Sequence, residues 1–295
     1  MEVGILRRII RVFLMVFVCL SVSTVSFAES VIKMTYKEGD KLPLIAAKPD
    51  NSGAYLELFT QAAKKAGCKL EVVRLPKKRL HKQLAKGTLD FYPGASFSKK
   101  RANYLCYIEN GFMTGEYGIT SSKVTEISDY KQVKEKDLLW LMEPGSSKTE
   151  FAAAMGAKTQ FVNFANVDKV QQLIAKGRNN FYVADKELVD YYLKNKGYAS
   201  FSEVGLKVHK NCCGGEIPMY MGFSRFSPHY KEKPNPGYDK TKALSPDNFP
   251  TVVDPDCVAY KLGKAFKEMS ASGETAKIIT SIFLNSALTK MVFHL

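Results

Sequence analysis

Residues 87–101 read GTLDFYPGASFSKKR, and the order of turn, strand and helix signals in this stretch decides the fold of the chain. Gly87 ends a predicted helix, and residues 89–92 form a short buried strand. A Pro-Gly turn follows at 93–94, and Ser98 begins a new helix. This order places a polar loop at the carboxyl end of a strand, where open α/β sheets bind ligands.

The loop carries side chains that suit an anion. Ser96 and Ser98 supply hydroxyl groups, and the planar Arg101 guanidinium donates two parallel hydrogen bonds, which is the geometry that a carboxylate accepts. Backbone N–H groups at the start of the helix add partial positive charge. In the alternative interpretation Ser98 only caps the helix and Arg101 is a solvated helix residue.

The first 28 residues have the pattern of an export signal. Arginines between residues 7 and 11 precede an apolar run over residues 12–20, and small residues then lead to Ala28. The run is shorter than the stretch of about 20 apolar residues that spans a membrane. We therefore expect a signal peptide over 1–28, cleavage after Ala28 and a periplasmic protein, with an uncleaved amino-terminal anchor as the alternative.

Composition limits the partners. The chain has 43 Lys and Arg against 29 Asp and Glu, a formal net charge of +14. Such a charge attracts an anionic ligand or an anionic envelope surface. The basic residues are scattered rather than gathered in a patch with aromatic residues, so we predict no nucleic-acid partner.

The cysteines after the signal are odd in number, so at least one of them is unpaired or pairs with another chain. An exported protein can form disulfides. The sequence does not decide the pairing among Cys68, Cys106, Cys212, Cys213 and Cys257.

The first part of the chain alternates strands and helices. Residues 31–36 read as a strand with Tyr36 at its carboxyl end, and Ser52 caps a helix that Gly67 ends. Residues 70–75 form a second strand, and a short helix after Pro76 leads back to the opening stretch. This is the pattern of a largely parallel, covered sheet.

A second round repeats the pattern from residue 138. A strand over 138–142 is followed by a Pro-Gly-Ser-Ser turn, in which Ser147 and Glu150 form a capping box for a helix ending at Gly156. Further strands are predicted over 160–164 and 181–184. A helix between them begins at Asn166 and ends at Gly177, and Asp185 stands at the end of the last strand, where a helix cap is its alternative role.

The two rounds predict two Rossmann-like α/β lobes. Residues 85–92 (AKGTLDFY) and 175–182 (AKGRNNFY) share a helix stop and a strand start. Segments 116–121 and 219–224 are candidates for two paired hinge strands between the lobes. We assign 29–118 and 220–295 to lobe 1 and 119–219 to lobe 2.

The last part of lobe 1 begins with a Pro-rich segment. Residues 228–256 lack a helical period, which predicts a long surface loop. After Asp256 the helical period resumes, with Tyr260, Phe266 and Met269 on one buried stripe. Gly273 then separates a final helix with apolar residues at 278, 279, 282 and 283.

Three motifs resemble a known family. They are the G-x-x-D then S-x-x-x-x-R block (Gly87, Asp90, Ser96, Arg101), the G-S-S turn (Gly145, Ser146, Ser147) and the G-R block that ends in an acid (Gly177, Arg178, Asp185). Their order over roughly 31–283 resembles the type II periplasmic solute-binding proteins that serve polar amino acid uptake. The resemblance implies two lobes that close on a ligand, an inner-membrane ABC permease as partner, no cofactor, no metal and no catalysis.

The resemblance also implies roles for single residues. Arg101 and Ser96 would bind the ligand α-carboxylate, with donors added by Ser146 and Ser147. Asp185 and the backbone near Gly94 would bind the α-ammonium group. The family usually has an aromatic residue where this chain has Lys77, so Tyr36 or Tyr92 would supply the stacking, and Lys77 or Arg79 would favour an anionic ligand unless they are solvated helix residues.

Two other functions use the same residues or the same fold. His209, Cys212 and Cys213 are close enough for a thiol nucleophile or a metal site, although adjacent cysteines rarely bind one metal and a disulfide or a strained loop is the simpler reading. A sensor or binding module for another small anionic metabolite, without a transporter, would have the same fold. We expect a stand-alone exported module because neither a transmembrane helix nor a catalytic domain follows Leu295.

Overall fold

A computed structural model describes residues 30–163, 167–176 and 179–291. The strands are β1 (Ser30–Tyr36), β2 (Cys68–Arg74), β3 (Phe91–Ala95), β4 (Leu105–Ser121), β5 (Leu139–Met142), β6 (Lys158–Phe161), β7 (Asn180–Asp185), β8 (Leu206–His209), β9 (Glu216–Ser224), β10 (Glu232–Pro234) and β11 (Thr251–Val253). The helices are α2 (Ala54–Lys65), α3 (Lys77–Leu84), α4 (Lys99–Ala102), α5 (Lys131–Glu135), α6 (Thr149–Ala154), α7 (Val167–Ala175), α8 (Lys186–Lys196), the 3₁₀ helix η1 (Phe201–Val204), α9 (Val258–Ala271) and α10 (Glu274–Met291).

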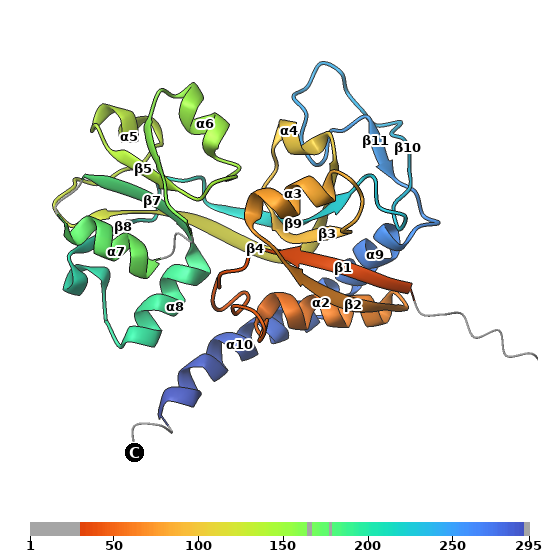
Figure 1. Cartoon of the computed structure of the whole chain (residues 1–295), viewed down its shortest axis with the longest axis horizontal. Helices are drawn as coiled ribbons and strands as arrows, with labels where there is room; N and C mark the ends of the chain where they lie inside the picture. The colour runs from red at the N-terminus through yellow and green to blue at the C-terminus, as the bar shows by residue number, and fades with distance from the viewer. Residues whose placement is uncertain (1–29, 164–166, 177–178, 292–295) are drawn as a thin grey trace, which may run out of the picture. The chain divides into compact units, whose positions relative to one another are not determined.

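One mixed sheet runs through both lobes in the order β2-β1-β3-β9-β4-β7-β5-β6, with β8 also paired to β4. The antiparallel pair of β4 and β9 lies in its middle, between β1–β3 on one side and β5–β7 on the other (Figure 1). The first half of β4 pairs with β9, and its second half pairs with β7 and β8. The predicted hinge segments are thus parts of β4 and β9, but 116–121 pairs with β7 and β8 instead of 219–224.

The core of lobe 1 is built on aromatic rings. Phe59 of α2 stacks on Phe91 of β3 at 5.0 Å between ring centroids and meets Phe266 of α9 edge-on at 5.0 Å. Phe223 of β9 stacks on the other side of Phe91 at 5.9 Å. All four side chains are fully buried. Helical and strand periods therefore bring residues from four separate segments to one centre.

Lobe 2 has a core on each face of its sheet. Alternation along β5 directs Trp140 and Met142 to one face, where α5 and α6 cover them, and Leu141 to the other, where α7 and α8 lie. Helices cover both faces as predicted, but the sheet is less parallel than predicted: β5 is parallel to β6 and β7, whereas β4 is antiparallel to β7 and β8. Together with lobe 1 it makes the two-lobed α/β architecture; the residue boundaries assigned to the lobes stay a prediction.

The predicted Pro-Gly turn at 93–94 is wrong, because both residues lie inside β3. The ladder between β3 and β9 is irregular between Tyr92 and Ala95, so the proline is placed where no regular ladder bond is needed. Position 94 has no room for a side chain, since a Cβ there would lie 2.1 Å from the Tyr55 hydroxyl, and this explains the glycine.

Two predicted helix caps are also wrong. Gly53, not Ser52, occupies the N-cap of α2, and its backbone packs against the loop at Leu44, where a Cβ would lie 2.7 Å from the carbonyl oxygen. The capping box of Ser147 and Glu150 does not form, because α6 begins at Thr149 after Lys148. The turn before α6 is instead held by Ser146, whose hydroxyl accepts from Lys148 N–H and whose carbonyl oxygen accepts from Thr149 N–H.

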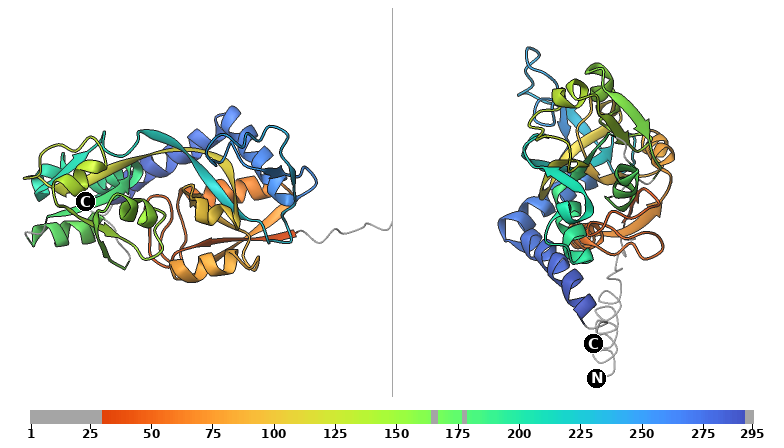
Figure 2. Two further views of the ribbon diagram at one scale, coloured as in Figure 1. Left: turned by 90° about the horizontal axis from the view of Figure 1, so that it is seen from above. Right: turned by 90° about the vertical axis from the view of Figure 1, so that its left-hand side faces the viewer.

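The carboxyl-terminal part differs in detail from the prediction. Segment 228–256 is mainly loop, although β10 and β11 pair within it, and it lies beside the start of α9 (Figures 1 and 2). Hydrogen bonds such as the one from Ala259 N–H to the His229 carbonyl oxygen hold it there. Tyr260 is 42% exposed and not part of the buried stripe that holds Phe266 and Met269. The exposure follows from its place on the outer face of α9.

Several predictions concern residues outside the described part of the chain. They include the export signal over 1–28, the end of the 160–164 strand, the Asn166 cap, Gly177 and Arg178. Phe283 belongs to α10, but its side chain is not described. Among the described helices, each is too short or too polar to cross a membrane.

Gly87 and Gly67 form a matched pair for a stability test. Both follow a helix with φ of +72°, but a Cβ at Gly87 would lie 2.0 Å from the Phe226 carbonyl oxygen, whereas none lies within 4 Å at Gly67. We expect Gly67→Ala to cost about 1 to 2 kcal/mol through its backbone conformation. Gly87→Ala should cost about 1 to 3 kcal/mol more through overpacking. Urea unfolding measures both; equal losses would contradict the close approach.

Candidate functional site

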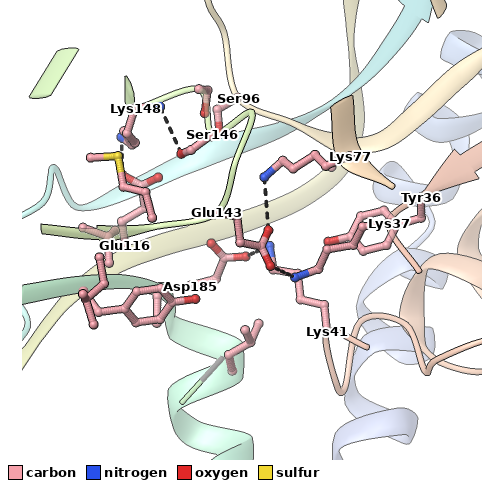
Figure 3. A pocket seen from close by; sticks show the side chains of 18 of the residues that line it. Tyr36, Lys37, Lys41, Lys77, Ser96, Glu116, Glu143, Ser146, Lys148 and Asp185 are labelled. Atoms are coloured by element: carbon pink, nitrogen blue, oxygen red, sulfur yellow. Dashed lines mark hydrogen bonds and ion pairs between the residues drawn. The ribbon is translucent and has the colours of Figure 1, made fainter. Parts of the chain in front are cut away.

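All eight residues predicted for the site line one cleft of about 140 Å³. They are Tyr36, Tyr92, Gly94, Ser96, Arg101, Ser146, Ser147 and Asp185. A cavity of about 150 Å³ holds a molecule the size of benzene, so the cleft suits a small ligand. Figure 3 shows that the side chains reach it from several elements. Their roles toward a ligand remain predictions.

Strand ends explain why these residues meet. β1 pairs with β3 in parallel, and β5 pairs with β7 in parallel, so residues after each strand gather at the same edge of their lobe. Tyr36 ends β1, Asp185 ends β7, and Glu143 follows β5 directly. The β4–β9 pair joins the two parts of the sheet, and both edges contribute to the cleft.

Arg101 is buried, with 9% of its surface exposed, so it is not the solvated helix residue of the alternative interpretation. Ser98 does cap α4, since its hydroxyl accepts a hydrogen bond from Arg101 N–H at 3.4 Å. The guanidinium donates to the Gly145 carbonyl oxygen at 2.7 Å. Among the ion pairs formed by the described residues, Arg101 takes part in none, although its lining neighbours Lys37, Lys41, Lys77 and Lys148 all do.

The turn opposite Arg101 presents serines. Gly145 adopts φ of +83°, which a residue with a side chain rarely does, and this turns the chain after β5. Ser146 Oγ accepts a hydrogen bond from Lys148 N–H at 3.3 Å. Within the described residues, the hydroxyls of Ser96 and Ser147 form no hydrogen bond and remain able to donate one to a ligand.

Asp185 occupies the N-cap position of α8, but its side chain makes no capping hydrogen bond. Its carboxylate instead forms an ion pair with Lys41 from the loop after β1 (Figure 3). Burial would lower the pKa of Lys41, but the neighbouring Asp185 outweighs burial and holds that pKa well above its usual value. The capping role of Asp185 is therefore excluded, and the expected ammonium site already holds a lysine.

Glu143 is a cleft residue that the sequence analysis missed. It accepts from Lys37 Nζ at 2.5 Å and pairs with Lys77 Nζ at 3.4 Å. Burial would raise the pKa of Glu143, but the two lysines outweigh it and hold that pKa below its usual range. The signal was present, because Glu143 follows a predicted strand as Asp185 does.

A third acid, Glu116 of β4, pairs with Lys148 Nζ at 2.6 Å and accepts from the Tyr130 hydroxyl at 3.0 Å. Both groups that contact the Glu116 carboxylate therefore belong to lobe 2. Neither partner was predicted, because their pairing with β4 depends on how α5 and the turn before α6 pack. The cleft thus brings lysines and acids together from separate segments.

Tyr36 and Tyr92 lie against each other in the wall of the cleft. Their rings stack at 5.0 Å between centroids and 16° between planes, and both residues are buried. Burial raises the pKa of both phenols, so they are neutral hydrogen-bonding groups at ordinary pH. Stacking on a ligand remains a prediction, and the ring faces that contact each other are not available for it.

The cysteines do not form a metal centre in this arrangement. Cys212 and Cys213 form a disulfide with each other, packed beside Phe181 in the core of lobe 2. His209 Nδ1 accepts from Ile127 N–H at 3.1 Å, and its Nε2 lies 2.7 Å from Thr120 Oγ1. Within the described residues, no group of three or more His, Cys, Asp or Glu side chains is placed to hold a metal ion.

Neither a family model nor a curated protein matches this chain in a sequence comparison. Solved structures do match in fold. They include the arginine-, lysine- and histidine-binding protein ArtJ of Geobacillus stearothermophilus, with 13% identity, a TM-score of 0.60, and 86% of this chain and 95% of that chain covered.

Two more structures match over similar lengths. The GluR0 ligand-binding core of Nostoc punctiforme, in complex with L-glutamate, has 10% identity and a TM-score of 0.60, with 86% of this chain and 99% of that chain covered. The ancestral amino acid-binding protein AncCDT-1, a precursor of cyclohexadienyl dehydratase, has 16% identity and a TM-score of 0.59, with 86% and 95% covered. The predicted fold is confirmed: this chain has the two-lobed α/β fold of type II periplasmic binding proteins.

Proposed function

We propose that this chain is an exported solute-binding protein of the type II family that serves polar amino acid uptake. It captures a small carboxylate-bearing ligand, an amino acid or a related anion, and delivers it to an inner-membrane ABC permease. The fold supports a binding role, since the matching structures are named as amino acid-binding proteins or ligand-binding cores. The charges of the cleft support the carboxylate.

One observation carries the proposal. Arg101 is a buried cation whose guanidinium meets only a neutral carbonyl oxygen, while the neighbouring described lysines of the cleft face carboxylates. Placing a charge away from water is costly unless an opposite charge accompanies it. A ligand carboxylate supplies that charge, and the hydroxyls of Ser96 and Ser147 add donors beside it.

Binding proceeds by closure of the two lobes. The ligand docks on Arg101 and Ser96 of lobe 1, and the turn of Ser146 and Ser147 then approaches from lobe 2. Closure stabilises the liganded state because the second set of donors contacts the ligand only when the lobes are close. The parts of β4 and β9 that join the lobes are the hinge segments of this proposal.

Export and transport complete the proposal. The arginines, apolar run and small residues of 1–28 are the basis for a periplasmic location. A sensor module without a permease is the second candidate, favoured by the match to a ligand-binding core with bound glutamate. Both candidates bind the same ligand at the same site, and only a transport assay with the permease separates them.

We propose binding without catalysis. The thiol alternative is weakened by the disulfide between Cys212 and Cys213, since a disulfide sulfur is no nucleophile. His209 is buried and bonded on both ring nitrogens, away from the cleft. The name of one matching protein connects this fold to a dehydratase, so turnover of any bound ligand is worth measuring.

Arg101→Ala tests the carboxylate site. We expect a loss of about 2 to 5 kcal/mol in binding free energy, because the ligand carboxylate would stay buried without its partner. This corresponds to a Kd that is higher by roughly thirtyfold or more. Titration calorimetry with L-glutamate, L-arginine and succinate identifies the ligand and measures the loss. Arg79→Ala, an exposed arginine on the neighbouring α3, is the control and should change nothing; equal affinities of the parent and Arg101→Ala would refute the clamp.

Lys77 gives the site a pH dependence. Burial lowers its pKa to about 8, Glu143 opposes this shift, and the nearby cations Lys37, Arg101 and Lys41 add to it. Between pH 8 and the usual lysine pKa of about 10.5 the unfolded chain binds more protons than the folded one, so stability should rise with pH in this window.

Anion affinity should change in the opposite direction, since a carboxylate favours the charged lysine that is lost above pH 8. Both slopes are measured relative to Lys77→Met, by urea unfolding and by calorimetry from pH 7 to 10. Parallel pH profiles of parent and variant would show that Lys77 does not titrate there.

The export step is tested by the amino terminus of the secreted protein. Expression of the full chain in a Gram-negative host should yield a periplasmic form that begins at Glu29, because the small residues before it fit the signal peptidase. Terminal sequencing and intact mass identify the cleavage point. Retention of Met1 in a membrane fraction would support the uncleaved anchor instead.

A further inference from the structure

Lys41 is held firmly in the loop that follows β1. Its backbone N–H donates to the Ile45 carbonyl at 2.8 Å, and its own carbonyl accepts from Leu44 N–H at 2.8 Å. Leu44 and Ile45 are fully buried, so the loop is anchored in the lobe 1 core. The lysine therefore projects from a fixed backbone, and its side chain is 20% exposed.

The ammonium group of Lys41 contacts the acid to which the family resemblance assigns a ligand's ammonium group. Lys41 Nζ forms an ion pair with Asp185, the acid expected to bind an α-ammonium group (Figure 3). Asp185 comes from β7 of lobe 2, with a side chain 19% exposed, and its position is fixed by pairing with Glu116 of β4. The protein thus supplies its own cation to this acid.

The other acids of the cleft interior are satisfied in the same way. Glu143 faces Lys37 and Lys77, and Glu116 faces Lys148. Asp40, half-buried where the cleft adjoins a second pocket lined by Tyr191, forms no ion pair among the described residues. It is the one carboxylate of the described lining that could receive a ligand cation without breaking a pair.

The two ends of a zwitterion would therefore meet unequal conditions. Its carboxylate reaches Arg101 without displacing any ion pair. Its ammonium group would have to displace Lys41 from Asp185, leaving a mostly buried lysine without a partner, which is strongly unfavourable. A second carboxylate on the ligand would meet Lys77, whose contact with Glu143 is the longer of that acid's two lysine contacts at 3.4 Å.

We propose that Lys41 is the specificity-determining residue of the cleft and that the ligand is a small dicarboxylate without an α-ammonium group. Lys41 acts as a fixed counter-ion that takes the ammonium position and so excludes α-amino acids. This inference rests on the proposed function, since it needs the carboxylate site at Arg101. It narrows that function from carboxylates in general to one class of them.

The test uses ligand pairs that differ only in the amine. Calorimetry of the chain from residue 29 compares succinate with L-aspartate and glutarate with L-glutamate. We expect the parent to bind each amine-free acid at least about tenfold more tightly than its amino acid. Lys41→Met keeps the length of the side chain and removes its charge, so it should move this ratio toward the amino acid by about tenfold or more.

Two further variants make the result specific. Lys41→Arg keeps the cation and should preserve the preference, which guards against a fold defect in Lys41→Met. Lys48→Met, which removes an exposed lysine of the same loop, should leave the ratio unchanged. Because each result is a ratio of two ligands on one protein, partial loss of folded protein does not alter it.

The outcomes separate the two claims. Tighter binding of L-aspartate or L-glutamate by the parent, or an unchanged ratio in Lys41→Met, would overturn the inference and leave the carboxylate site intact. If the parent preferred amino acids and Asp40→Asn removed that preference, the ligand ammonium group would bind at Asp40. This outcome would also overturn the inference. Binding of none of the four acids by the parent would also overturn the inference, and the proposed function itself would fall only if L-arginine did not bind either.

Discussion

The antiparallel pairing of β4 with β9 is the constraint on which the rest of the structure depends. These strands lie in the middle of the sheet, and the remaining strands are added on either side of the pair. β3 hydrogen-bonds to β9 on one side, and β7 hydrogen-bonds to β4 on the other. The strand ends that carry Tyr36 and Asp185 therefore line one cleft, although these two residues are 149 positions apart in the sequence.

Charge pairing is the second constraint, because the cleft holds five cations and four acids in partly buried positions. Such groups are tolerated when each has a partner of opposite sign. The lysines of lobe 1 that bind Glu143 and Asp185 connect the lobes electrostatically, and Arg101 reaches a carbonyl of lobe 2. Among the cations of the described lining, Arg101 alone has no carboxylate partner, which makes the cleft a site for an anion. Both of our proposals depend on this difference.

Much of the architecture follows from local signals. Gly67 and Gly87 end helices where predicted, both with positive φ, and strand positions in the first lobe agree within a few residues. The cap predictions fail at Ser52 and Ser147 because packing of the neighbouring loop decides which residue begins a helix. Pro93 and Gly94 read as a turn, yet an irregular ladder and contact with Tyr55 place them in a strand.

The sequence by itself determined the α/β class and the residues at strand ends, since hydrophobic period and turn chemistry act between near neighbours. All eight predicted cleft residues lie together for that reason. Only the tertiary structure decided which charges face one another: Lys41 lies far from Asp185 in the sequence, as Lys37 does from Glu143. An ion pair forms between atoms a few ångströms apart in space, and no local pattern encodes the partner that folding brings across the cleft.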